Sequence, residues 1–71
     1  MKLEVLTPDK SLYSGNIKII KVPGSDGSFE VLNNHAPLIS TLEKGTIIIT
    51  SMDGKTSKIE IAGGVIEVKK N

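Results

Sequence analysis

Short apolar runs, most of them alternating with polar residues, follow one another along the whole 71-residue chain. The clearest are KLEVL at 2–6, SFEVL at 28–32 and VIEVKK at 65–70. Each run holds a pair of apolar residues two positions apart, which places the pair on one face of a β-strand. The pairs are Leu3 and Val5, Phe29 and Val31, and Ile66 and Val68. No stretch sustains the apolar spacing of a helix. The pattern predicts one all-β domain over residues 1–71 with about seven short strands, a small antiparallel β-sandwich or flattened barrel.

Turn residues separate the runs. Asp53-Gly54 joins two apolar runs, and an Asp-Gly pair tolerates the two positive φ angles of a type I′ turn, so we predict a hairpin there. Val22–Ser25 has proline and glycine at the central positions, which is the signature of a type II turn. We also expect the chain to turn at Ser14–Asn16 and at Gly63-Gly64.

Several runs carry adjacent apolar residues, which breaks the alternation. Ile19-Ile20 predicts a bulge or a strand that is buried on both faces. The same break in alternation occurs at Ile47–Ile49, Leu38-Ile39 and Val65-Ile66. Because a two-sheet core buries only one face of each strand, these runs predict apolar side chains on the outside. Either a partner covers them, or the twist and loops of so small a domain do.

The composition narrows the function. There is no cysteine, which excludes disulfides, thiol catalysis and cysteine zinc sites, and which suits a reducing compartment. The net charge is +1, every basic residue is lysine, and there are one Tyr and one Phe, whereas nucleic-acid surfaces concentrate arginine and stacking aromatics. No apolar run approaches the roughly 20 residues that span a bilayer, and the first ten residues are too polar for a secretory signal. We expect a soluble protein, or one held at a membrane only through a partner.

The one histidine, His35, lies in the stretch VLNNHAPLIS at 31–40. A catalytic triad needs an orienting carboxylate and a nearby nucleophile, and a zinc site needs three or four ligands, but no such signature accompanies it. We therefore favour a contact-forming loop over catalysis or metal binding. The glycines of Gly24–Ser28 could cradle a phosphate, yet a phosphate loop should open a helix and this one opens a strand. We expect no catalytic residue, no metal and no cofactor.

An ordered series of motifs resembles the amino-terminal domain of the epsilon subunit of F-type ATP synthase. The motifs are LEVLTP, LYSG before a strand that ends in VPG, DGSFEVLNNHAPLISTLEKG and GGVIEV. Glu30 stands where the family usually has glycine, and Asn33-Asn34 where Pro-Gly is common. Members usually continue with another strand and a helical hairpin, and these 71 residues contain neither. The resemblance therefore gives no ground for assigning inhibition of ATP hydrolysis or ATP binding to this chain.

The resemblance implies a non-catalytic rotor part at the foot of the central stalk. One face would pack on the gamma subunit and one end would rest on the membrane c-ring, at the cytoplasmic face of the bacterial inner membrane. Matching motifs suggest gamma-subunit contacts at Thr7, Leu38, Ser40 and Ile47. They suggest c-ring contacts at Asp26, Ser28, Glu30 and His35. The main alternative is a small β-barrel module that binds single-stranded nucleic acid, and an enzyme comes third.

Overall fold

The structure is a computed structural model that describes residues 1–24, 27–32 and 36–70. Over these ranges the strands are β1 (Lys2–Leu6), β2 (Ser11–Gly24), β3 (Gly27–Leu32), β4 (Leu38–Leu42), β5 (Gly45–Ser51), β6 (Thr56–Ile61) and β7 (Gly64–Lys69). All the strand pairings described are antiparallel, so the predicted fold class is confirmed. None of the described residues lies in a helix, and accordingly no helix among them could cross a membrane.

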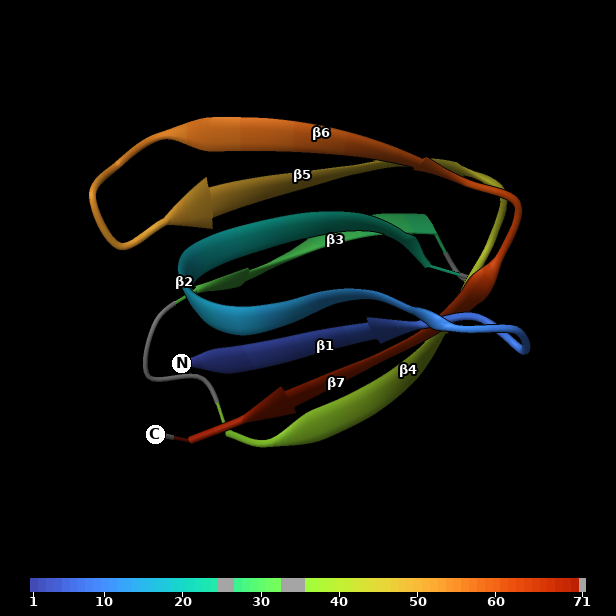
Figure 1. Cartoon of the computed structure of the whole chain (residues 1–71), viewed down its shortest axis with the longest axis horizontal. Coiled ribbons are helices and arrows are strands. Elements are labelled where there is room, and N and C mark those ends of the chain that lie inside the picture. The colour runs from blue at the N-terminus through green and yellow to red at the C-terminus, as the bar shows by residue number, and fades with distance from the viewer. Residues whose placement is uncertain (25–26, 33–35, 71) are drawn as a thin grey trace.

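The strands form two layers because the long strand β2 takes part in both. Its first half, Ser11–Asn16, pairs with β1, and β1 continues through β7 to β4. Its second half, from Ile17 onward, lies between β3 and β5, and β5 continues to β6. Figure 1 shows β2 bending back at one end of the molecule. At the other end Gly24 pairs with Leu42 of β4, which closes the layers into a flattened barrel.

A bulge in β2 makes this double membership possible. The register against β5 shifts between Ile17 and Ile19, which confirms the predicted break in alternation. Ile17 and Ile20 are both fully buried, whereas Lys18 is exposed and Ile19 is half-buried. One extra residue in a strand changes which face its later side chains occupy. Ile17 and Ile20, which stand on either side of this shift, can therefore both point into the same interior.

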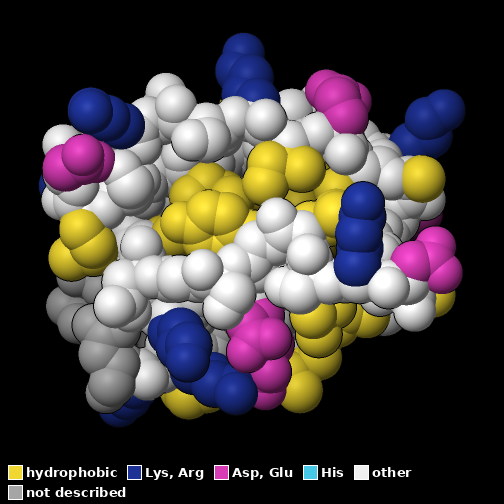
Figure 2. Space-filling view, in the orientation of Figure 1, with side chains coloured by type: hydrophobic (Ala, Val, Ile, Leu, Met, Phe, Trp, Pro, Cys, Tyr) yellow, Lys and Arg dark blue, Asp and Glu magenta, His cyan; other side chains and the backbone are white. Residues whose placement is uncertain are grey.

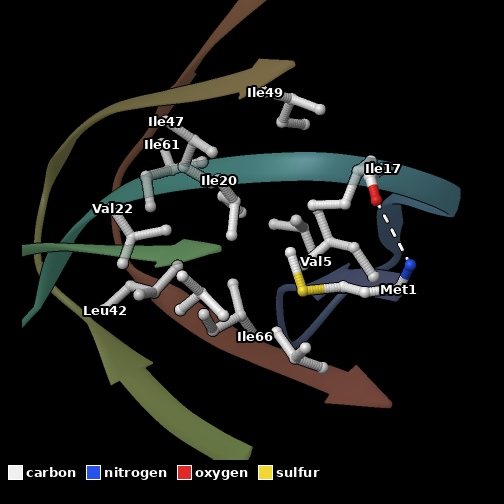
Figure 3. Close-up of a cluster of buried hydrophobic side chains, with 13 residues drawn as sticks. Met1, Val5, Ile17, Ile20, Val22, Leu42, Ile47, Ile49, Ile61 and Ile66 are labelled. Atoms are coloured by element: carbon white, nitrogen blue, oxygen red, sulfur yellow. Dashed lines mark hydrogen bonds between the residues drawn. The ribbon is translucent and has the colours of Figure 1, made fainter. Parts of the chain in front are cut away.

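The interior is almost wholly aliphatic. Figure 3 shows side chains from both layers converging on one cluster. Among the described residues the buried members are Met1, Leu3, Val5, Ile17, Ile20, Val22, Val31, Leu42, Ile47, Ile49, Ile61, Ile66 and Val68. No polar or charged side chain described is buried with them. Packing of this kind is close and leaves few voids, so single methylene groups affect stability.

Two predicted turns are wrong. Ser14–Asn16 does not turn, because these residues pair in register with β1. The predicted type II turn at Val22–Ser25 is also wrong over its described residues, because Pro23 and Gly24, its central residues, pair in register with β3. Ser25 lies outside the described residues. Gly24 is needed for space instead, since a Cβ there would lie 2.6 Å from the Phe29 ring.

The hairpin between β5 and β6 is confirmed, but its turn type is not. The Gly54 N–H donates to the Ser51 carbonyl at 2.9 Å, and the Ser51 N–H donates to the Lys55 carbonyl at 2.8 Å. This pattern belongs to a three-residue loop that ends on a residue with positive φ, and Gly54 has a φ of 87°. A type I′ turn would instead have a two-residue loop.

Gly63-Gly64 turns the chain from one layer into the other, as expected. Both residues have positive φ, 126° and 151° respectively. A Cβ on Gly64 would lie 2.5 Å from the carbonyl oxygen of Leu6. This corner therefore needs glycine both for its backbone conformation and for the close approach of β1.

Replacing isoleucines within the run 47–49 should separate the inner from the outer face. Ile47→Val should lower the free energy of unfolding by about 0.5–1.5 kcal/mol, because it removes a methyl group from a fully buried site. Ile48→Val is the matched control, and its effect should be smaller because Ile48 is only half-buried. Urea unfolding followed by circular dichroism measures both. Equal losses would contradict the assigned faces.

Two glycine replacements should separate backbone conformation from steric contact. Gly54→Ala should cost about 1–2 kcal/mol, because φ is positive while no atom lies within 4 Å of the added Cβ. Gly64→Ala should cost clearly more, because the new methyl also meets the backbone of β1. Thermal and urea unfolding of the two variants test this order. If Gly64→Ala were the milder change, the packing of this corner would be wrong.

Candidate partner-binding surfaces

The described polar side chains offer little from which a catalytic site could be built. The described part of the chain holds no group of three or more His, Cys, Asp or Glu side chains that could hold a metal ion. The chain's two aromatic residues, Tyr13 and Phe29, are partly buried against the core and offer no exposed stacking platform. The features that call for explanation are apolar side chains that point outward.

One outward surface, called here the β4–β7 face, is carried by β1, β7 and β4. Residues paired across strands share a face, and because Ile66 points into the core, its neighbours Val65 and Glu67 point outward. Ile39 pairs with Glu67 and is 72% exposed, more than any other large apolar side chain described. The outward residues that define this face are Leu6, Ile39, Thr41, Val65 and Glu67.

An open hollow lies beside each end of the β4–β7 face. The larger, about 750 Å³, lies where the β1–β2 loop meets the corner before β7. It is lined by Leu6, Thr7, Pro8, Asp9, Ala62, Gly63, Gly64 and Val65. The smaller, about 350 Å³, lies between β4 and β7 and is lined by Pro37, Leu38, Ile39, Glu67, Val68 and Lys69. Both linings are mainly apolar, so either hollow could receive an apolar side chain.

Charges border the β4–β7 face on β1 and β7. Glu4 lies directly opposite Glu67, and Lys2 lies directly opposite Lys69. Such like-charged pairs repel, but each lysine also has a glutamate as a diagonal neighbour. The Lys69 ammonium lies 3.5 Å from the Glu67 carboxylate along the same strand. In water this exposed ion pair stabilises the fold little. The apolar residues of the β4–β7 face are therefore bordered by charged residues of both signs, whose charges nearly cancel.

The opposite layer has a second outward surface, called here the β2–β5 face. Ile19 pairs with Leu32, which is 55% exposed, and Ile48 pairs with Lys21 and Lys58. Its apolar side chains thus have charged neighbours across the strands. Figure 2 shows one side of the molecule, where apolar side chains gather near the centre and charged ones stand around them. Outward apolar residues therefore occur on both layers, as the sequence predicts.

The four predicted gamma-subunit contacts do not lie together. Thr7 lines the larger hollow, and its hydroxyl accepts the Lys10 N–H at 3.3 Å. Leu38 and Ser40 pair with Val68 and Ile66, so they share the inner face of β4, where both are only half-buried. Leu38 also lines the smaller hollow. Thr7 and Leu38 therefore lie at the hollows beside the β4–β7 face, whereas Ser40 lies on the inner side of the layer.

Ile47 is a wrong choice for a contact. Its side chain is fully buried in the core, so no partner can reach it while the fold is intact. The run of three isoleucines hid this, because a shift of one residue exchanges the two faces of a strand. The exposed residue that sequence reasoning missed is Ile39. Alternation could have found it, since it stands between Leu38 and Ser40 and must point the other way.

Only half of the predicted c-ring contacts can be located. Asp26 and His35 lie outside the described residues. Ser28 and Glu30 are exposed on β3, and both point outward because Phe29 and Val31 point inward. Glu30 lies opposite Lys21, a favourable cross-strand pair of unlike charge.

Comparison with known proteins identifies the family. Residues 1–71 match the family described as ATP synthase, Delta/Epsilon chain, beta-sandwich domain. The ATP synthase epsilon chain of Leptospira borgpetersenii is 44% identical over all of this chain, which covers 55% of that relative. The ATP synthase epsilon chain of Pelotomaculum thermopropionicum is 40% identical over 99% of this chain and 52% of the relative. That of Chlorobium limicola is 36% identical over 99% of this chain and 80% of the relative.

The extent of these matches differs between relatives. The chain spans about half the length of the Leptospira and Pelotomaculum proteins and four fifths of the Chlorobium protein. The match covers every strand described above and the whole aliphatic core. The chain therefore belongs to the delta/epsilon family of ATP synthase chains and corresponds to the β-sandwich domain of that family.

Proposed function

We propose that this chain is a non-catalytic rotor part of an F-type ATP synthase that joins the gamma subunit to the c-ring. It would work at the cytoplasmic face of the bacterial inner membrane, held there only through the complex. Membership of the epsilon-chain family supports the complex, and the apolar β4–β7 face supports a permanent protein partner. The observation that carries the proposal is Ile39, a large aliphatic side chain on β4 that is left 72% exposed on the outside of the layer.

A rotor part must transmit torque without deforming. Two layers that share the strand β2 and enclose one aliphatic core cannot slide freely past each other. Close-packed interiors have low compressibility, so a load applied at one face reaches the other with little loss. This stiffness supports a mechanical role, in which the domain connects two larger bodies and performs no chemistry itself.

We assign the gamma-subunit contact to the β4–β7 face. Ile39 would be its main anchor, because binding energy concentrates in a few apolar or aromatic side chains that become buried in an interface. Thr7 and Leu38 line the hollows at its two ends, which are places for apolar side chains of the partner. The charges around Glu67 would then stay at the wetter rim.

We assign the c-ring contact to the outward-pointing residues of β3 and to the segments that precede and follow this strand in the sequence. Ser28 and Glu30 are exposed there and can form hydrogen bonds with polar loops. Asp26 and His35 complete this set as proposed contacts. A polar contact at one end and an apolar contact on a face are the two attachments that a connecting piece needs.

The gamma-subunit contact can be tested with one charge. Ile39→Glu should weaken the one-to-one complex with purified gamma subunit by roughly 10- to 100-fold, because it removes an anchor and buries a carboxylate. Leu32→Glu is the matched control: it places the same charge at an exposed apolar site, but on the β2–β5 face, and should bind as the native chain does. Isothermal titration calorimetry measures both affinities.

The outcomes test the assigned contact face and the proposed rotor function separately. If Ile39→Glu stays folded and binds normally while Leu32→Glu binds weakly, the assigned face is wrong. If the native chain shows no affinity for the gamma subunit, the proposed rotor role itself fails.

A further inference from the structure

The β5–β6 hairpin carries a chemical feature that partner binding does not use. Its three-residue loop is Met52–Gly54, and all three residues are exposed. Aspartate followed by glycine is the dipeptide most prone to isomerise, because glycine has no side chain to hinder its own backbone nitrogen. An exposed Asp-Gly pair in a tight loop is therefore a candidate site for spontaneous modification.

The reaction has two balanced steps. The Gly54 nitrogen forms a bond to the side-chain carboxyl carbon of Asp53. The carboxyl hydroxyl and the amide proton leave together as one water molecule. Water then opens the resulting succinimide ring. Attack at the side-chain carbonyl restores aspartate, whereas attack at the main-chain carbonyl leaves isoaspartate, in which the backbone runs through the side chain and is one methylene longer.

Three contacts in the folded loop oppose the first step. The Gly54 N–H donates to the Ser51 carbonyl at 2.9 Å, which makes its proton harder to remove. The Lys55 N–H donates to Oδ1 of Asp53 at 3.3 Å, and the Ser51 hydroxyl donates to the same oxygen. That hydroxyl also lies 3.1 Å from the Lys55 carbonyl, and its single proton serves one acceptor at a time. Together these bonds hold the nucleophile and the carboxyl group in place.

The protonation state of Asp53 also opposes ring closure. The hydrogen bond from Ser51, and then that from Lys55, lower the pKa of Asp53. Ring closure needs the protonated carboxyl, because an ionised carboxylate is a poor electrophile and has no hydroxyl group to lose. A lowered pKa means that less of this form is present at neutral pH, so ring closure is slower. These bonds contribute stability above the ordinary aspartate pKa, and the contribution is lost as pH falls through the lowered value.

We propose that Asp53-Gly54 is a latent isomerisation site that the folded hairpin suppresses, with Ser51 as the positioning residue. Isoaspartate would lengthen the three-residue loop and disrupt the Ser51–Lys55 pairing that closes it. The hydroxyl of Ser51 thereby preserves the covalent structure of the loop. The other Asp-Gly pair, Asp26-Gly27, includes a residue outside the described ranges and is not part of this inference.

The test ages the folded chain at neutral pH in water enriched in heavy oxygen. Each succinimide hydrolysis adds one heavy oxygen, whichever product forms. Tryptic digestion in ordinary water then yields peptide 45–55, in which Asp53 is the only aspartate. Ser51→Ala should label this peptide roughly two- to tenfold faster than the native chain, the range set by the net free energy of one hydrogen bond. The same chain in urea should label faster still.

Two variants serve as controls. Ser51→Thr keeps the hydroxyl and should label at the native rate. Thr46→Ala removes a different hydroxyl of the same hairpin, one that donates to Glu60 at 2.5 Å, and should also leave the rate unchanged. Amide hydrogen exchange verifies that β5 and β6 remain paired in each variant. If Ser51→Ala disrupts the pairing, Ser51→Thr against the native chain and native against urea-unfolded chain still test the suppression.

A second readout distinguishes positioning from general loosening. Carbon NMR of the Asp53 carboxyl should show its pKa rising toward the ordinary value in Ser51→Ala and staying low in Ser51→Thr. The proposal is overturned if Ser51→Ala labels at the native rate, if Ser51→Thr labels as fast as Ser51→Ala, or if the native fold labels as fast as the urea-unfolded chain.

Discussion

The bulge in β2 between Ile17 and Ile19 governs much of this structure. It lets one strand supply an edge to the first layer and an inner strand to the second, while Ile17 and Ile20 both stay in the same interior. A domain of this size has little surface to bury and no disulfide to help, so each layer depends on the other for its stability. A strand shared between layers fixes their separation and angle as well as their contact.

Sequence alternation predicts the strands well where it is strict. Leu3 and Val5 point inward as expected, and so do Ile66 and Val68. It fails where neighbouring residues are alike: nothing in the run of isoleucines at 47–49 tells which one faces the core, because the answer depends on pairing with β2 and β6. Turn signals fail for a related reason, since a glycine can be required for space as well as for a turn.

The candidate surface illustrates the same limit. Ile39 and Ile47 are the same residue type in similar strands, yet one is 72% exposed and the other fully buried. The sequence can state that more apolar surface exists than one core can hide, but only the pairing of β4 with β7 tells where the excess lies. Family resemblance suggested contact residues beside this surface, and it missed Ile39, its most exposed apolar residue.

The close packing around Gly24 restricts what position 24 can hold. A Cβ there would lie 2.6 Å from the Phe29 ring and 2.9 Å from the carbonyl oxygen of Gly27. A smaller residue at position 29 would relieve only the first clash, because the second is with the backbone. Position 24 is thus expected to remain glycine over evolutionary time, and it is a poor starting point for redesign.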